Sequence, residues 1–108
     1  MSFDDGHERL LNAVEALAAS SAPIHRRLEA AGLSLLPLQA GDFADAADAE
    51  LLEEILMALT GVADPTGEHG DMALTAFSMS DAEAVRVAKL IVDLHRRVSD
   101  LKPARRSR

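Results

Sequence analysis

The sequence predicts an all-α protein, and three observations favour that class. Alanine and leucine, both strong helix formers, make up a third of the 108 residues. Tyrosine, tryptophan and cysteine are absent, and β-branched residues are sparse before the last helix, which disfavours a sheet. Apolar residues repeat at helical spacing, most clearly over residues 80–101. A chain of this length forms one domain, so we expect a compact four-helix bundle over residues 1–101.

The first two helices are expected near the start of the chain. Aspartates cap a first helix over about 5–19, and apolar residues on one face alternate with glutamates on the other. Two serines followed by Pro23 break that helix and open a second one, over 22–31. Gly32 then suits the C′ position that ends the second helix.

The leucine-rich segment 33–42 interrupts the helical pattern. Pro37 disfavours a helical conformation for Leu36, so we expect an extended segment held across the bundle by its leucines. An aspartate then caps a third helix over 46–60. A long 62–79 connection follows, punctuated by glycines and a proline, with a possible fifth helical turn near 72–78.

The last helix, over 80–101, is the clearest element. Ser80 and Glu83 have the spacing of a capping box. The apolar residues beyond them spread over an arc of roughly 220°, whereas a helix on one neighbour needs about 100°. We therefore expect this helix to be covered from two sides, either inside a bundle or between two subunits. Opposite charges at i,i+4 on its outer stripe, Lys89–Asp93 and Asp93–Arg97 among them, predict ion pairs.

The charge of the chain is negative but unevenly placed. The net charge is −7, and four of the 11 basic residues lie in the segment 102–108, which we expect to be a disordered basic tail. The acidic body repels nucleic acid and anionic membranes and favours a basic partner or solubility alone. No apolar run reaches 18 residues, so we expect no transmembrane helix and a cytoplasmic location.

Motifs for catalysis or cofactor binding are lacking. The sequence has no nucleophilic cysteine, no Gly-x-Ser-x-Gly and no glycine-rich phosphate loop. Its carboxylates fall on expected outer helix faces. We therefore expect no enzyme and no cofactor. Asp64, Glu68, His69 and Asp71 share one loop, but their spacing fits no EF-hand, so a solvated polar loop is the preferred interpretation.

His95 lies near the middle of the apolar arc of the last helix. A histidine in that position needs a hydrogen-bond partner to offset its loss of water. The preferred interpretation is a hydrogen-bonded histidine of the core or of an interface. A pH-sensitive contact and a metal ligand are the alternatives.

These observations predict a small acidic protein–protein interaction module, acting as a regulator, an adaptor or a subunit of a larger complex. The wide apolar arc predicts a homodimer that self-associates through Val87, Ile91, Leu94, His95, Val98 and Leu101. Apolar residues outside that helix predict a surface for another protein, formed by Leu35, Leu36, Leu38, Met72 and Phe77. The alternative is a helical DNA-binding transcriptional regulator that uses its basic C-terminal tail, although the last helix alternates arginine with aspartate.

Overall fold

Helices account for most of the described part of the chain. The computed structural model describes residues 3–62 and 70–106, and side chains within 6–62 and 70–99. In these ranges it contains five α-helices, one short 3-10 helix and no strand, which confirms the all-α prediction. The elements are α1 (Phe3–Ala19), α2 (Ile24–Leu35), η1 (Ala40–Asp42), α3 (Ala46–Leu59), α4 (Asp71–Ser78) and α5 (Asp81–Arg106).

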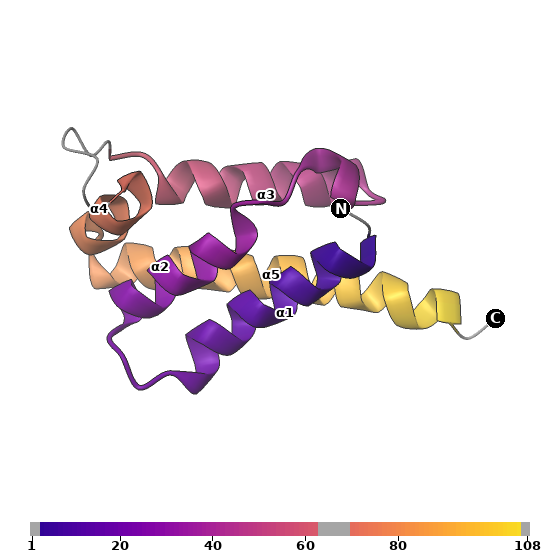
Figure 1. Cartoon of the computed structure of the whole chain (residues 1–108), viewed down its shortest axis with the longest axis horizontal. Helices are drawn as coiled ribbons and strands as arrows, with labels where there is room; N and C mark the ends of the chain where they lie inside the picture. Colours follow the sequence, from indigo (N-terminus) through magenta and orange to yellow (C-terminus); the bar gives the residue numbers. More distant parts are fainter. Residues whose placement is uncertain (1–2, 63–69, 107–108) are drawn as a thin grey trace.

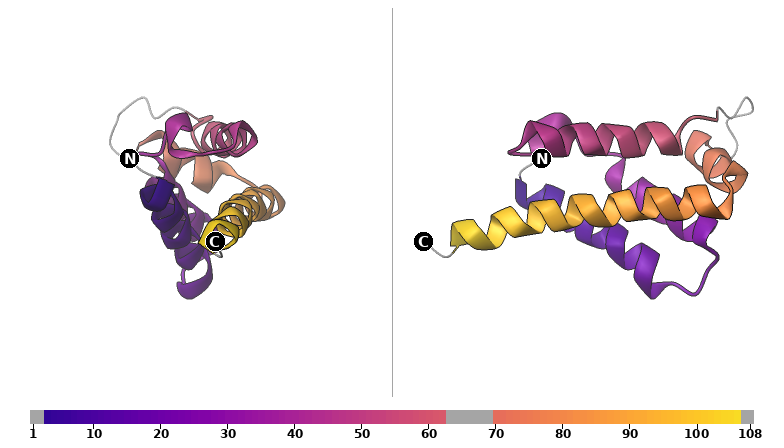
Figure 2. Two further views of the ribbon diagram at one scale, coloured as in Figure 1. Left: turned by 90° about the vertical axis from the view of Figure 1, so that its right-hand side faces the viewer. Right: turned by 180° about the vertical axis from the view of Figure 1, so that it is seen from behind.

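The helices pack around α5. In Figure 1, α3 and α5 run alongside each other, and the α1–α2 pair crosses α5 on the other side. The short helix α4 closes one end, where it contacts α2 and α3. The end-on view in Figure 2 shows α3, α5 and the α1–α2 pair around a shared centre. The opposite end of α5 extends past the other helices, which gives the molecule its longest dimension of 50 Å.

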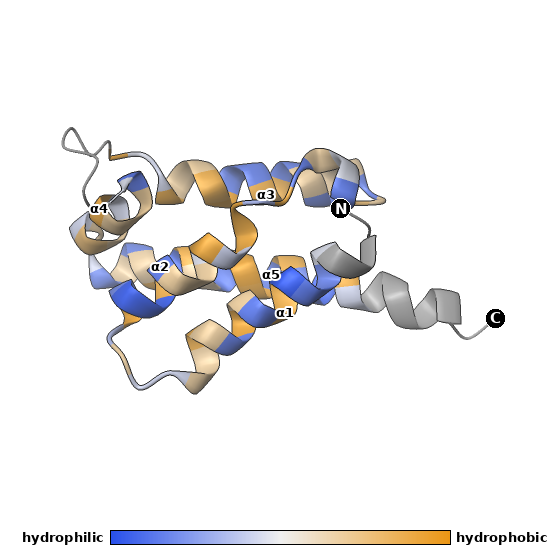
Figure 3. Cartoon of the chain, viewed as in Figure 1, coloured by the Kyte–Doolittle hydropathy of each residue, from blue (hydrophilic) through white to orange (hydrophobic). Residues whose placement is uncertain are grey.

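The apolar arc of α5 is covered mainly within the single chain. Figure 3 shows hydrophobic and hydrophilic residues interspersed along the coloured parts of the helices. Ala84, Val87, Ile91 and Leu94 of α5 are fully buried, and α1, α2 and α3 all contact this helix. The protein's own helices therefore cover the central line of this arc from more than one side.

The end of α2 differs from the sequence-based expectation. The helix continues through Gly32 to Leu35, and Leu36 adopts right-handed helical angles of φ −56° and ψ −38° although Pro37 follows it. The N–H of Leu36 donates to the carbonyl of Gly32 at 3.0 Å. The predictions of a helix end at Gly32 and of an extended Leu36 are wrong. Burial of Leu35 in the core outweighs the local preference of a residue before proline.

The caps of the later helices follow the sequence closely. The backbone N–H of Glu83 donates to Oγ of Ser80 at 3.1 Å, which is half of the expected capping box. The N-cap of α3 is Asp45, whose Oδ1 accepts from the N–H of Ala47 at 2.9 Å. The fifth helix suggested for 72–78 is present as α4.

The connection and the C-terminal segment are partly described. Thr75 of α4 holds the end of the preceding segment, because its Oγ1 accepts from the N–H of Val62 at 2.8 Å. Residues 63–69 of the long connection lie outside the described residues. The helix α5 continues to Arg106, so helix also includes residues 102–106, where the sequence predicts a disordered tail. Lysine, alanine and arginine in that segment are good helix formers, whereas Pro103 is a poor one.

Candidate functional site

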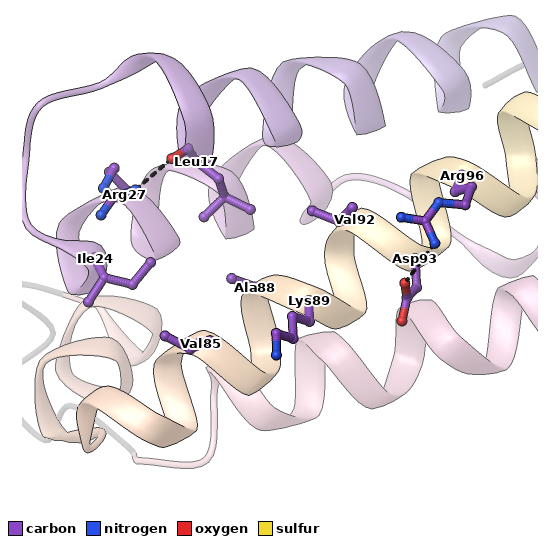
Figure 4. A pocket seen from close by; sticks show the side chains of 9 residues that line it. All are labelled: Leu17, Ile24, Arg27, Val85, Ala88, Lys89, Val92, Asp93 and Arg96. Carbon is purple, nitrogen blue, oxygen red and sulfur yellow. Dashed lines mark hydrogen bonds and ion pairs between the residues drawn. The ribbon is translucent and has the colours of Figure 1, made fainter.

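An open groove runs between the α1–α2 corner and the first half of α5. We call it the α5 groove. It has a volume of about 460 Å³, and its walls come from three helices (Figure 4). The residues that line it are Leu17, Ile24, Arg27, Val85, Ala88, Lys89, Val92, Asp93 and Arg96. A groove of this size, with an apolar floor and a few polar groups at its edge, has the usual features of a binding site.

The floor of the α5 groove is one flank of the wide apolar arc of α5. Val85, Ala88 and Val92 follow the i, i+3, i+7 spacing of a helix face. Val85 is 42% exposed, and the other two are half-buried. Leu17 and Ile24 form the opposite wall, and Figure 4 shows the side chains of Leu17 and Val92 projecting into the space between the walls. The protein's own helices therefore leave this flank only partly covered.

The edge of the groove is positively charged. Arg27, Lys89 and Arg96 lie there with a single carboxylate, Asp93, so the lining carries a formal charge of +2 in a chain of −7. Arg96 is 3.7 Å from Asp93, and both side chains are mostly exposed. Water screens the attraction between two exposed charges, so this ion pair is weak. The edge of the groove therefore keeps most of its positive potential.

Arg27 is held firmly in the groove wall. Its Nε donates to the carbonyl of Ala22 and its Nη1 to the carbonyl of Leu17, each at 2.7 Å. These bonds satisfy carbonyls at the end of α1 and in the following turn, which otherwise lack helical partners. The same side chain thus fixes the α1–α2 corner and places a positive charge at the groove.

Lys89 is an exposed cation at the edge of the groove. Within the described part of the chain no hydrogen bond or ion pair engages it. The expected Lys89–Asp93 and Asp93–Arg97 pairs do not form, because Asp93 pairs with Arg96 and Arg97 turns toward α3. Lys89 is therefore available to an incoming anionic group.

The residues expected to mediate self-association are mostly in the core. Val87, Ile91 and Leu94 have no exposed surface, because α1, α2 and α3 cover them. The prediction that these three side chains face a second copy is wrong for this fold. His95 and Val98 are half-buried, and the side chain of Leu101 lies outside the described residues.

The residues expected to bind another protein do not form one surface. Leu35, Leu38 and Met72 are buried in the core, so that part of the prediction is also wrong. Leu36 and Phe77 are each 51% exposed.

Leu36 and Phe77 have different surroundings. Leu36 lines a hollow of about 360 Å³ between α2, the end of α3 and α4, and Phe77 is not among the residues of that hollow. Phe77 instead lies under the guanidinium of Arg26, 5.7 Å from the ring centre. The guanidinium therefore covers part of one face of the ring in a cation–π contact.

His95 belongs to a small polar cluster between α1 and α5. Its ring stacks on that of His7 with centroids 5.5 Å apart. Both Nε2 atoms face the hydroxyl of Ser99, at 3.1 Å for His7 and 3.3 Å for His95. The preferred interpretation of His95 as a hydrogen-bonded histidine is confirmed, and its partners belong to the same chain.

Arg97 of α5 and Asp48 of α3 form a salt bridge that the sequence analysis did not predict. Asp48 is only 2% exposed, and its Oδ1 accepts from Nε of Arg97, while Asp45 lies 3.9 Å from the same guanidinium. The hydrogen bond to Asp48 and the negative charge of that carboxylate raise the pKa of Arg97. A buried carboxylate needs such a partner. The helical spacing of Asp48 and Leu52, which share the inner face of α3, was the available signal.

The candidate metal loop is largely outside the described structure. Asp64, Glu68 and His69 lie outside the described residues, and Asp71 is in the first turn of α4. Among the residues that are described, no three histidine, cysteine, aspartate or glutamate side chains are grouped to hold a metal ion.

Comparison with protein-family models, curated proteins and solved structures finds no match to this chain. Within the described residues, no helix combines the length and apolar character needed to cross a membrane. The α5 groove is therefore interpreted from its own geometry and chemistry.

Proposed function

We propose that this protein is a small, non-catalytic protein–protein interaction module that binds its partner through the α5 groove. It would act as a regulator, an adaptor or a subunit of a larger complex in the cytoplasm. The observation that carries the proposal is the incompletely covered flank of α5, formed by Val85, Ala88 and Val92. A partner that covers this flank gains the free energy of burying apolar surface.

The polar groups of the α5 groove differ from the other polar clusters of the protein, and this difference supports a binding role for the groove. The Arg97–Asp48 pair and the His7–His95–Ser99 cluster both join helices of the same chain. Their groups already have partners inside the fold. The groove instead combines apolar side chains that are only partly covered with Lys89, whose charge no described neighbour engages. That combination suits recognition of another molecule.

An affinity purification from the native host at low salt tests the proposed function. The tagged full-length chain should recover a partner in stoichiometric amount, and low salt is needed because ionic screening weakens contacts between exposed charges. Recovery of no stoichiometric partner, under conditions that keep the chain folded, contradicts an interaction module.

Self-association is a separate proposal. Val87, Ile91 and Leu94 are buried, so a homodimer would have to use the other expected residues, such as His95 and Val98, or a different surface. Sedimentation velocity over a range of concentrations measures the mass directly. A monomer at all concentrations contradicts the homodimer.

DNA binding is the second candidate function. The observation in its favour is that α5 continues to Arg106, so Lys102, Arg105 and Arg106 lie on a helical extension beyond the bundle. Recognition elements for DNA are commonly basic helices. A gel shift at physiological salt, with the whole chain and with a chain lacking residues 102–108, separates the two functions. A shift that disappears with the truncation favours DNA binding, and no shift with either chain contradicts it.

A further inference from the structure

We infer that the α5 groove receives an amphipathic helix from a partner protein, and that carboxylates flank the apolar stripe of that helix. This inference rests on the proposed function and adds the chemistry of the partner. It is carried by the shape of the groove, by the spacing of its floor and by the charge of its edge.

The shape and spacing of the groove fit a helix. Val85, Ala88 and Val92 form a straight apolar line along α5, and seven residues of helix span about 10.5 Å. A second helix laid along this line places residues at i, i+3 or i+4 and i+7 against it, because ridges of one helix fill grooves of another. Leu17 and Ile24 provide the second wall that holds such a helix in place.

The charge of the groove selects an acidic helix. Arg27, Lys89 and Arg96 lie at the edge, with Asp93 as the one carboxylate of the lining. The chain as a whole is at −7, so most of its surface repels an acidic partner. Carboxylates on either side of an apolar stripe would therefore be attracted to this groove, and repulsion elsewhere would orient the partner.

A second copy of this protein fits the α5 groove poorly. Two concave surfaces with the same net charge neither fill each other nor attract each other. A second copy would have to offer a convex acidic face, such as the outer face of α3 with Glu50 and Glu53 around Met57. That face presents one apolar side chain to a groove whose floor has three. We therefore assign the groove to a different protein, and self-association becomes an outcome of the test.

Two synthetic peptides probe the inference directly. Each has about 18 residues, enough for a helix of roughly 27 Å, with leucines on one face. In the first peptide glutamates flank the leucines, and in its twin lysines take their place. Fluorescence anisotropy with the full-length protein at low and at physiological salt measures both affinities. The glutamate peptide should bind, more weakly at higher salt, and the lysine peptide should bind at least about tenfold less tightly.

Two variants of the groove and one control locate the binding. Lys89→Glu reverses an exposed charge at the edge and should weaken binding of the glutamate peptide about fivefold or more. Ala88→Leu fills the floor and should weaken both peptides. Arg26→Glu makes the same charge reversal on α2 outside the groove lining and should leave the affinity near that of the unmodified protein. Far-ultraviolet circular dichroism checks that all three variants are folded.

Several results overturn the inference. Equal binding of the two peptides shows that charge does not select the occupant. An affinity for the glutamate peptide that ignores Lys89→Glu and Ala88→Leu places it elsewhere. A dimer in sedimentation that Lys89→Glu converts to monomer assigns the groove to a second copy. If a native partner is captured equally well by both groove variants, the proposed function stands and this inference fails. If the glutamate peptide binds as expected but no native partner is captured, the inference stands and the proposed function fails.

Discussion

Replacing Gly32 with alanine tests how α2 packs against the rest of the molecule. Gly32 is buried inside α2, and a Cβ atom at this position would lie 2.5 Å from Sδ and 3.1 Å from Cε of Met72, and 2.9 Å from Cδ1 of Leu59. These distances are shorter than van der Waals contact. Alanine therefore forces the ends of the Met72 and Leu59 side chains to move, and the core must repack around them.

The expected energies follow from two opposing effects. Alanine removes the helix penalty of glycine, about 1 kcal/mol, while overpacking a core costs about 1–3 kcal/mol. Gly32→Ala should thus lower the free energy of unfolding by about 1 kcal/mol. Met72→Ala removes Sδ and Cε and by itself should cost about 2–5 kcal/mol. In that background Gly32→Ala should be close to neutral, because the contacts with Met72 are gone and only Cδ1 of Leu59, at 2.9 Å, still has to move.

Urea unfolding of the four proteins, followed by far-ultraviolet circular dichroism, measures this double-mutant cycle. Gly6→Ala is the matched control, since it lies in α1 and its Cβ would meet the carbonyl oxygen of Asp42 at 3.4 Å, an ordinary contact. It should not destabilise the protein. If Gly32→Ala costs the same with and without Met72, crowding is not the cause, and a helix end at Gly32 explains the loss better.

Three further predictions concern caps and charges. Ser80→Ala removes the N-cap of α5 and should lower the free energy of unfolding by about 1 kcal/mol in urea titrations; no change would show that the cap contributes nothing. Thr75→Val removes the hydroxyl that joins α4 to Val62 and should also cost about 1 kcal/mol by the same assay, so a neutral result would contradict that link. The hydrogen bond from Arg86 lowers the pKa of Glu83 below its ordinary value of 4.5, so its stabilising effect is present above that value and is lost as the pH falls through the lowered pKa. Carboxyl titration by NMR should show the lowered pKa of Glu83 returning to its ordinary value in Arg86→Ala, and an unchanged pKa would refute the pairing.

Local signals predicted the later helices better than the earlier ones. Ser80 and Asp45 are caps that act through their own side chains on the next few residues, so their effect is visible in a short stretch of sequence. The end of α2 depends on a distant contact, because Leu35 is buried against residues far along the chain. A glycine and a proline in the right order were therefore insufficient to end the helix at Gly32.

The candidate site on α5 also combines a feature that local sequence predicts with one that depends on distant contacts. The sequence indicates that apolar residues extend around more than half of this helix, and that some neighbour must cover them. It does not indicate which flank the neighbours reach. The core line through Val87 and Ile91 is covered by α1, α2 and α3, whereas the line through Val85 and Val92 is left half open. The residues expected to self-associate, Val87, Ile91 and Leu94, therefore lie on the covered line of this helix.

The sequence alone determined that this protein is helical, where α3 and α5 begin and that α5 needs cover from more than one side, because propensity, capping and periodicity act within a few residues. Only the tertiary structure decided that Asp48 is paired by Arg97, that Gly32 lies inside a helix and that a positively edged groove remains beside Val85, Ala88 and Val92. Those features depend on how closely separate helices approach each other, and that distance is set by the packing of all the side chains between them.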